Sequence, residues 1–277
     1  MIKKITIQSI QNKRNNNEKI TALTAYDYST ARYIDECGVD IVLVGDSLAN
    51  VALGYNSTQQ VGMNEMKIFT GAVARGVNRA LVVADMPFMS CSVSVEDAMI
   101  NIRELVKVGA QAVKIEGYNN HTLSVVKRCT EAGIPVVGHL GFTPQYIHQI
   151  GGYKVQGKTD KETELILEQA KQLENAGVFS IVLEMVPENS AKYITENISI
   201  PTIGIGAGVH CSGQILVTDD LLGKFSDYSP KFVRRYANLK EVMTSAIQGY
   251  CDDVRNEAFP SKDESFHQEG INVSTHN

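Results

Sequence analysis

The chain has 277 residues, of which 43% are hydrophobic and 21% charged, as in an ordinary globular protein of one large or two small domains. Its formal net charge of −5 provides no basic field for nucleic acid or an anionic membrane. The N-terminus lacks the apolar core of a secretory signal, and no stretch has the composition of a membrane-spanning helix. Five scattered cysteines without a C-x-x-C pair indicate reduced thiols, so we expect a cytoplasmic protein.

In chain order, the first strand candidate is residues 20–25. A unit then recurs five times: a helix-forming segment, a glycine, a short run rich in Val and Ile, and one polar residue. The five units end at Asp46, Asp85, Glu116, His139 and Glu184. Each glycine stands where a helix would end in a left-handed residue, and each continuous apolar run is typical of a parallel strand buried on both faces. Residues 201–208 and 214–217 supply the last strand candidates.

Capping patterns mark helices between these strands. Ser94 followed by Asp97, and Thr159 followed by Glu162, have the spacing of a capping box at a helix start. Apolar residues at helical spacing follow both pairs, which predicts one buried face on each helix. Helices therefore alternate with the strand candidates.

About eight strand candidates alternating with helices predict an α/β fold, a (β/α)8 (TIM) barrel, with an open doubly wound sheet as the alternative. We expect residues 1–259 to form a single catalytic barrel domain in which residues 225–256 provide the closing helices. Residues 260–277 are polar and are expected to form a mobile tail.

Both folds gather the carboxyl ends of the strands, where the five polar residues lie. Any single acid there could equally cap the next helix, but four carboxylates meeting in one pocket repel one another unless a positive charge lies among them. The candidates are a divalent cation and Lys114, which shares a strand face with Glu116. Mg²⁺ suits such a site, whereas a structural zinc site is disfavoured because no Cys or His pair has ligand spacing.

Three other features remain open or are disfavoured. Ser47 either caps the following turn or donates to a substrate carboxylate. Residues 204–208 (GIGAG) form either a tight turn or a cradle for an anion. Residues 152–159 match the P-loop expression, but no buried strand precedes them, so an ATPase or GTPase is disfavoured.

The chain resembles one known family from about residue 19 to residue 259, and nine segments carry the resemblance. They are TALTAYDYSTAR (21–32), VDIVLVGDSL (39–48), GAVARG (71–76), ALVVADMPF (80–88), AVKIEG (112–117), VVGHLGFTPQ (136–145), GGYKVQGKT (151–159), IVLEMVP (181–187) and PTIGIGAG (201–208). In these segments the chain resembles the ketopantoate hydroxymethyltransferase family. It departs from residues frequent in that family at Ala49, Asn50, Phe69 and Ser212, none of them a metal or base position.

The resemblance implies a (β/α)8 barrel that forms a homo-oligomer, commonly a decamer, and needs Mg²⁺. It implies transfer of a hydroxymethyl group from 5,10-methylenetetrahydrofolate to 3-methyl-2-oxobutanoate, giving 2-dehydropantoate. This reaction is the first committed step of pantothenate, and hence coenzyme A, biosynthesis. The family's metal-binding acids correspond to Asp46 and Asp85, with Glu116 completing the metal surroundings.

The resemblance also assigns substrate and catalytic residues. Those that bind the 2-oxoacid or line its pocket correspond to Asp46, Ser47, Asp85, Lys114 and His139. The family's proton acceptor corresponds to Glu184, which would remove the C3 proton while Mg²⁺ and Lys114 stabilise the developing enolate.

Two other functions remain as alternatives. A related Mg²⁺-dependent oxoacid lyase would share the barrel and the metal chemistry but cleave a C–C bond, and Cys91 would be its candidate loop cysteine. A non-catalytic barrel should lack the four strand-end acids and bind no Mg²⁺.

Overall fold

Eight parallel strands close into a barrel in the computed structural model, which describes residues 3–225 and 230–267. The strands are β1 (Ile20–Thr24), β2 (Ile41–Val44), β3 (Leu81–Asp85), β4 (Ala112–Glu116), β5 (Val136–Gly141), β6 (Ser180–Glu184), β7 (Thr202–Ile205) and β8 (Gly213–Leu216). Each pairs with the next, and β8 pairs with β1 to complete the ring. The predicted (β/α)8 barrel is thus confirmed over the open doubly wound sheet.

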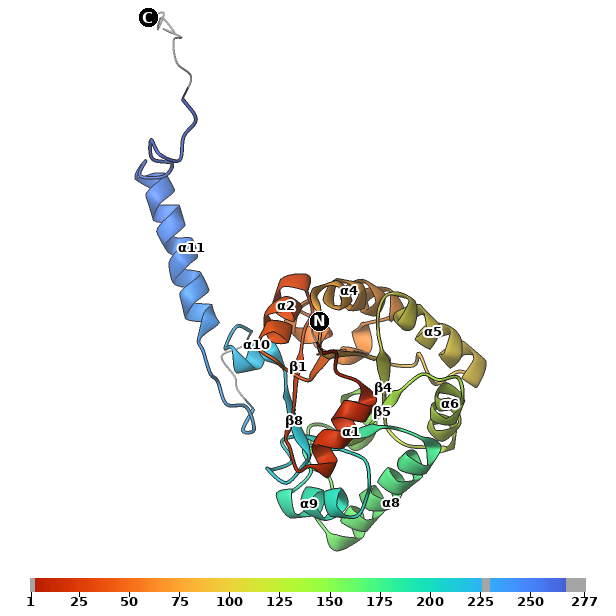
Figure 1. The fold of residues 1–277 in the computed structure, drawn as a ribbon. Helices are drawn as coiled ribbons and strands as arrows, with labels where there is room; N and C mark the ends of the chain where they lie inside the picture. Colours follow the sequence, from red (N-terminus) through yellow and green to blue (C-terminus); the bar gives the residue numbers. More distant parts are fainter. Residues whose placement is uncertain (1–2, 226–229, 268–277) are drawn as a thin grey trace, which may run out of the picture.

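Helices surround the barrel and cross one end of it (Figure 1). They are α1 (Ile7–Asn15), α2 (Tyr28–Glu36), α3 (Leu48–Val51), α4 (Met63–Gly76), α5 (Val95–Lys107), α6 (Asn120–Glu131), α7 (Ile147–Ile150), α8 (Asp160–Ala176), α9 (Glu188–Glu196), α10 (Thr218–Leu221) and α11 (Leu239–Arg255), with the 3-10 turns η1 (Thr58–Gln60) and η2 (Pro144–Tyr146). The predicted caps are present, since Ser94 accepts from the Asp97 N–H and Thr159 forms a reciprocal box with Glu162. None of the described helices is long and apolar enough to cross a lipid bilayer.

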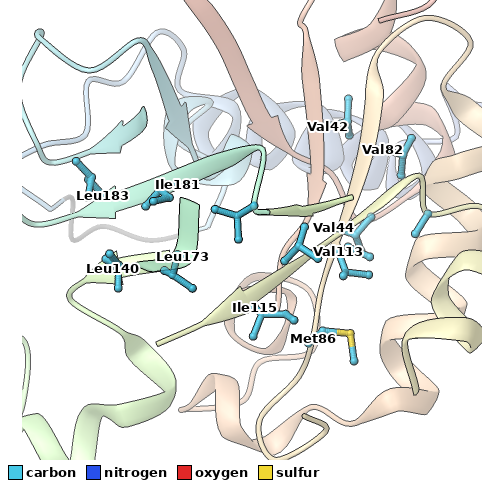
Figure 2. Packing of buried hydrophobic residues seen from close by; sticks show 14 of the residues in the cluster. Val42, Val44, Val82, Met86, Val113, Ile115, Leu140, Leu173, Ile181 and Leu183 are labelled. Atoms are coloured by element: carbon cyan, nitrogen blue, oxygen red, sulfur yellow. The ribbon is translucent and has the colours of Figure 1, made fainter. Parts of the chain in front are cut away.

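Side chains alternate along each strand between the inside of the barrel and the helical layer. In β2, Ile41 and Leu43 belong to the inner cluster, whereas Val42 and Val44 pack outward. Figure 2 shows part of the outward layer, with the valines of β2 to β4 on one side of the view and, on the other, side chains of β5 and β6 beside Leu173 of helix α8. Because both faces are buried, the strands are continuous apolar runs in the sequence.

Charged and apolar groups seal the amino-terminal end of the barrel. Ile10 of α1 is fully buried in the inner cluster. Asp40, just before β2, forms ion pairs with Lys13 at 2.7 Å and Arg79 at 3.6 Å. Asp35 accepts hydrogen bonds from three consecutive backbone N–H groups, residues 78–80. Access to the barrel interior is therefore from the carboxyl ends of the strands.

The C-terminal region differs from its prediction. Residues 225–256 were expected to close the barrel, but α11 stands away from it (Figure 1), and within this fully described helix no residue is buried. Of the tail predicted at 260–277, residues 260–267 are described, while 268–277 lie outside the described residues, as do 226–229.

The Asp35 contacts generate a stability prediction. Asp35→Ala should lower the free energy of unfolding by about 2–3 kcal/mol, because a buried N–H left without an acceptor costs roughly 1–3 kcal/mol. Urea denaturation measures this change. Glu36→Ala, at an exposed acid of the same helix, is the control and should lie near wild type. Equal stability of the two variants would contradict the assignment.

Candidate active site

All seven residues assigned from the sequence lie at or just after the carboxyl ends of strands. Asp46 and Ser47 follow β2, and the others lie within the last three positions of β3 to β6: Asp85, Lys114, Glu116, His139 and Glu184. Those five share the strand parity of the inner cluster, so their side chains enter the barrel. The structure thus brings the predicted residues together at one end of the barrel axis.

Lys114 is the fixed positive charge of this site. Its Nζ lies 2.9 Å from Asp85 Oδ1, and Asp85 Oδ2 accepts a hydrogen bond from the Asp46 N–H at 3.0 Å. Burial disfavours the charged amine, yet Asp85, Glu116 and Asp46 together raise the pKa of Lys114 above its ordinary value. Burial raises the pKa of Asp85, and Lys114 opposes that rise. Lys114 therefore remains a cation among buried acids.

Asp46 lies where negative charge is least compensated. Burial, with Asp85 and Glu116 nearby, raises the pKa of Asp46 to about 8, against the effects of Lys114 and Gln145. Its Oδ2 accepts a hydrogen bond from Gln145 Nε2 at 2.8 Å. The buried acids thus outnumber the positive charges around them, and a bound cation would relieve the imbalance.

His139 connects two carboxylates on its two sides. Nδ1 lies 3.1 Å from Glu116 Oε2, and Nε2 lies 3.2 Å from Glu184 Oε2. Burial and Lys114 lower the pKa of His139, but Glu116 and Glu184 outweigh them and raise it to about 9. Burial raises the pKa of Glu116, and His139, Lys114 and the Gln145 N–H bring it below its ordinary value. His139 therefore lies between Glu116 and Glu184, whose negative charges favour its protonated form.

Sequence reasoning missed two residues of the site. Tyr26, just after β1, is buried, and its hydroxyl lies 2.8 Å from Ser47 Oγ. Ser47 makes no side-chain cap to the described helix α3, so this contact orients its hydroxyl instead. Gln145 contacts Asp46 from the turn after β5. Both belong to segments that carry the family resemblance, and each follows a strand at the same end of the barrel. Their positions just after predicted strands were the sequence signal that could have identified them.

The donor set fits a hard divalent cation such as Mg²⁺, since buried carboxylate oxygens exceed the nearby positive charges. Among the described residues, however, no three Asp, Glu, His or Cys side chains already stand as a metal cluster. Each acid has another partner: Gln145 on Asp46, Lys114 on Asp85 and His139 on Glu116. Cation binding would therefore require some of these side chains to move.

The P-loop match has a structural explanation. The Glu162 carboxylate accepts hydrogen bonds from the N–H groups of Lys158 and Thr159 at 2.7 and 3.0 Å. An acid thus occupies the backbone donors that a phosphate would need. Gly157 meanwhile accepts from Thr163 and Ser190 through its carbonyl oxygen. The segment starts helix α8, in agreement with the expectation that it binds no nucleotide.

The cysteine of the rival lyase hypothesis is not activated. Burial raises the pKa of the Cys91 thiol to about 12. A reactive cysteine instead needs a lowered pKa and neighbouring positive charge. The structure therefore gives no support to Cys91 as a catalytic group.

Solved structures with the same fold include a phosphonopyruvate hydrolase complex with oxalate and Mg²⁺, at a TM-score of 0.59 and 11% identity over 94% of this chain and 93% of that one. A 2,3-dimethylmalate lyase aligns at a TM-score of 0.59 and 14% identity over 94% and 91%. At such low identity these similarities establish the barrel fold alone.

Sequence comparison gives the family. A protein named 3-methyl-2-oxobutanoate hydroxymethyltransferase from Thermoanaerobacter sp. (strain X514) is 52% identical to this chain, over 96% of this chain and 97% of that protein. The protein of that name in Syntrophus aciditrophicus (strain SB) is 53% identical, over 95% and 97%. A sequence model of the family matches residues 4–262. The chain therefore belongs to the ketopantoate hydroxymethyltransferase family.

Proposed function

We propose that the protein transfers a hydroxymethyl group from 5,10-methylenetetrahydrofolate to 3-methyl-2-oxobutanoate, giving 2-dehydropantoate, in the first committed step of pantothenate and coenzyme A synthesis. The observation that carries the proposal is the buried network in which Lys114 pairs with Asp85 and His139 joins Glu116 to Glu184. The names of relatives at about 50% identity supply the 2-oxoacid. The folate donor and the product follow from the family resemblance.

We assign Asp46 and Asp85 as ligands of Mg²⁺, with Glu116 completing its surroundings. When bound, Mg²⁺ withdraws electron density from the keto group of the 2-oxoacid and acidifies its C3–H bond. Lys114 adds a second positive charge, which is in place before negative charge develops on the substrate. Ser47, oriented by Tyr26, donates a hydrogen bond to the substrate carboxylate.

Glu184 acts as the general base. Its Oε2 lies against the His139 imidazolium, which leaves Oε1 to accept the C3 proton. The electron pair released at C3 then forms the bond to the methylene carbon of the folate donor. Both C–N bonds of that carbon break, their nitrogens take up protons to give tetrahydrofolate, and water supplies the new hydroxyl group and the balancing protons. His139 orients Glu184 and balances its negative charge. The resemblance also predicts that His139 contacts the substrate, but the proposed mechanism does not depend on that contact.

We further propose that the protein is a homo-oligomer, for which the resemblance implies a decamer. Helix α11 carries one exposed apolar stripe at helical spacing, made of Met243, Ile247, Tyr250 and Val254. Exposed apolar area of this kind is uncommon on a monomer and typical of an interface. We expect a second copy of the chain to bury this apolar stripe.

The base assignment predicts the behaviour of Glu184→Gln. The amide keeps the size of the side chain but cannot accept the proton, so C3–H exchange of 3-methyl-2-oxobutanoate in D2O should slow by about 10²–10⁴-fold. NMR follows the C3–H signal in the presence of Mg²⁺ and without folate. Glu188→Gln, at an exposed acid beyond β6, is the control and should exchange at the wild-type rate. Wild-type exchange in Glu184→Gln would refute the assignment.

The metal assignment predicts the behaviour of Asp85→Ala. Loss of a carboxylate ligand should raise the Mg²⁺ concentration needed for half-maximal exchange by at least about 10–100-fold, the usual cost of losing even an outer-sphere partner. A Mg²⁺ titration of the exchange rate measures the change. Asp160→Ala, at an exposed acid, should leave the titration unchanged. An unaltered Mg²⁺ titration in Asp85→Ala would remove that residue from the ligand set. In the wild type, a chelator should abolish C3–H exchange.

The oligomer proposal predicts a change of mass in solution. The double variant Ile247→Glu, Tyr250→Glu places charges in the apolar stripe and should yield a smaller species by analytical ultracentrifugation. Gln248→Glu adds a charge beside the stripe, where Gln248 contacts Asp252, and should keep the wild-type mass. A monomeric wild type, or an unchanged mass in the double variant, would contradict the proposal.

A further inference from the structure

Gln145 is a buried polar residue that the scheme above does not use. It lies in η2, the turn after β5, yet only 8% of its surface is exposed. Its Nε2 is 2.8 Å from Asp46 Oδ2 and 3.0 Å from the carbonyl oxygen of Met86. Since both partners are acceptors, both amide hydrogens are engaged, and the orientation of the amide is fixed.

The backbone of Gln145 makes two further connections. Its N–H donates to Glu116 Oε1 at 2.7 Å, and its carbonyl oxygen accepts from Gln59 Nε2 at 2.8 Å. One residue of the β5 loop thus contacts the ends of β2, β3 and β4 together with η1. Two of its partners, Asp46 and Glu116, are acids assigned above to the Mg²⁺ site.

We propose that Gln145 is a positioning residue of this site, which holds the Asp46 and Glu116 carboxylates at this end of the barrel, close to where they would bind a divalent cation. The inference rests on the proposed function. A donor on Asp46 Oδ2 restricts the rotation of that carboxylate, and Oδ1 takes no part in this contact. Without the donor, this contact would no longer hold Asp46 against the repulsion of the nearby Asp85 and Glu116 carboxylates.

The loop is held in place independently of the Gln145 side chain. The N–H of Phe142 donates to the Glu184 carbonyl oxygen at 2.8 Å, and the Phe142 side chain is fully buried. The Tyr146 ring lies against Gly117, where a Cβ would come within 2.7 Å of it. Replacement of the amide by an apolar group should therefore preserve the loop and remove only the side-chain donor.

The test is Mn²⁺ binding to metal-free, full-length protein, followed by electron paramagnetic resonance. Gln145→Leu should weaken Mn²⁺ binding by about 10–100-fold, as loss of an outer-sphere partner commonly does. Gln145→Met, which also lacks a donor but keeps the length of the side chain, should give the same loss and serves if the leucine variant does not fold. Gln149→Leu is the matched control, because Gln149 is an exposed glutamine of the same loop.

A second readout separates positioning from a general structural defect. At saturating Mg²⁺, C3–H exchange by Gln145→Leu should recover toward wild type, since the defect lies in cation affinity. Wild-type Mn²⁺ affinity in Gln145→Leu, or an equal loss in Gln149→Leu, would overturn the inference. Absence of Mn²⁺ binding by the wild type would instead refute the metal assignment in the proposed function, and this inference with it.

Discussion

The burial of three carboxylates beside a fourth, partly buried one at one end of a barrel is the constraint on which the rest of this site depends. Charges removed from water are costly unless they are paired and hydrogen-bonded. Here Lys114 and His139 supply the paired cations, and Gln145 supplies neutral donors. The amino-terminal end of the barrel carries its own acids and seals the opposite side. The remaining negative charge faces the one open end, where a cation and an anionic substrate are expected to meet.

Strand register determines which charges become partners. Asp85 lies opposite Lys114 in the β3–β4 ladder, and Glu116 lies opposite His139 in the β4–β5 ladder. Lys114 and Glu116 are two residues apart and enter the barrel on the same face. A shift of one residue in either ladder would turn these side chains toward the helices, which form an apolar layer. The apolar alternation that sets the register therefore also assembles the charged network.

The strand ends and their acids were predictable because they depend on local patterns. A short apolar run after a glycine indicates a buried strand, and its last polar residue must lie at the carboxyl end. The role of Gln145 was not predictable in this way, since its partner Asp46 is 99 residues distant and the contact depends on the path of a loop. The same limit explains α11. Its apolar stripe predicts a helix that is covered, but nothing in a local pattern identifies what covers it.

Exposure distinguishes the proposed base from the proposed metal ligands. The Glu184 side chain is 17% exposed, whereas those of Asp85 and Glu116 are 3% and 2% exposed. A carboxylate that binds a cation benefits from a dry surrounding, because electrostatic attraction is stronger there. A base that exchanges a proton with water needs a path to solvent in each cycle. His139 lies between the two environments, with one nitrogen near Glu116 and the other near Glu184. A change in the charge of Glu184 therefore changes the electrostatic environment of Glu116, beside the proposed cation site.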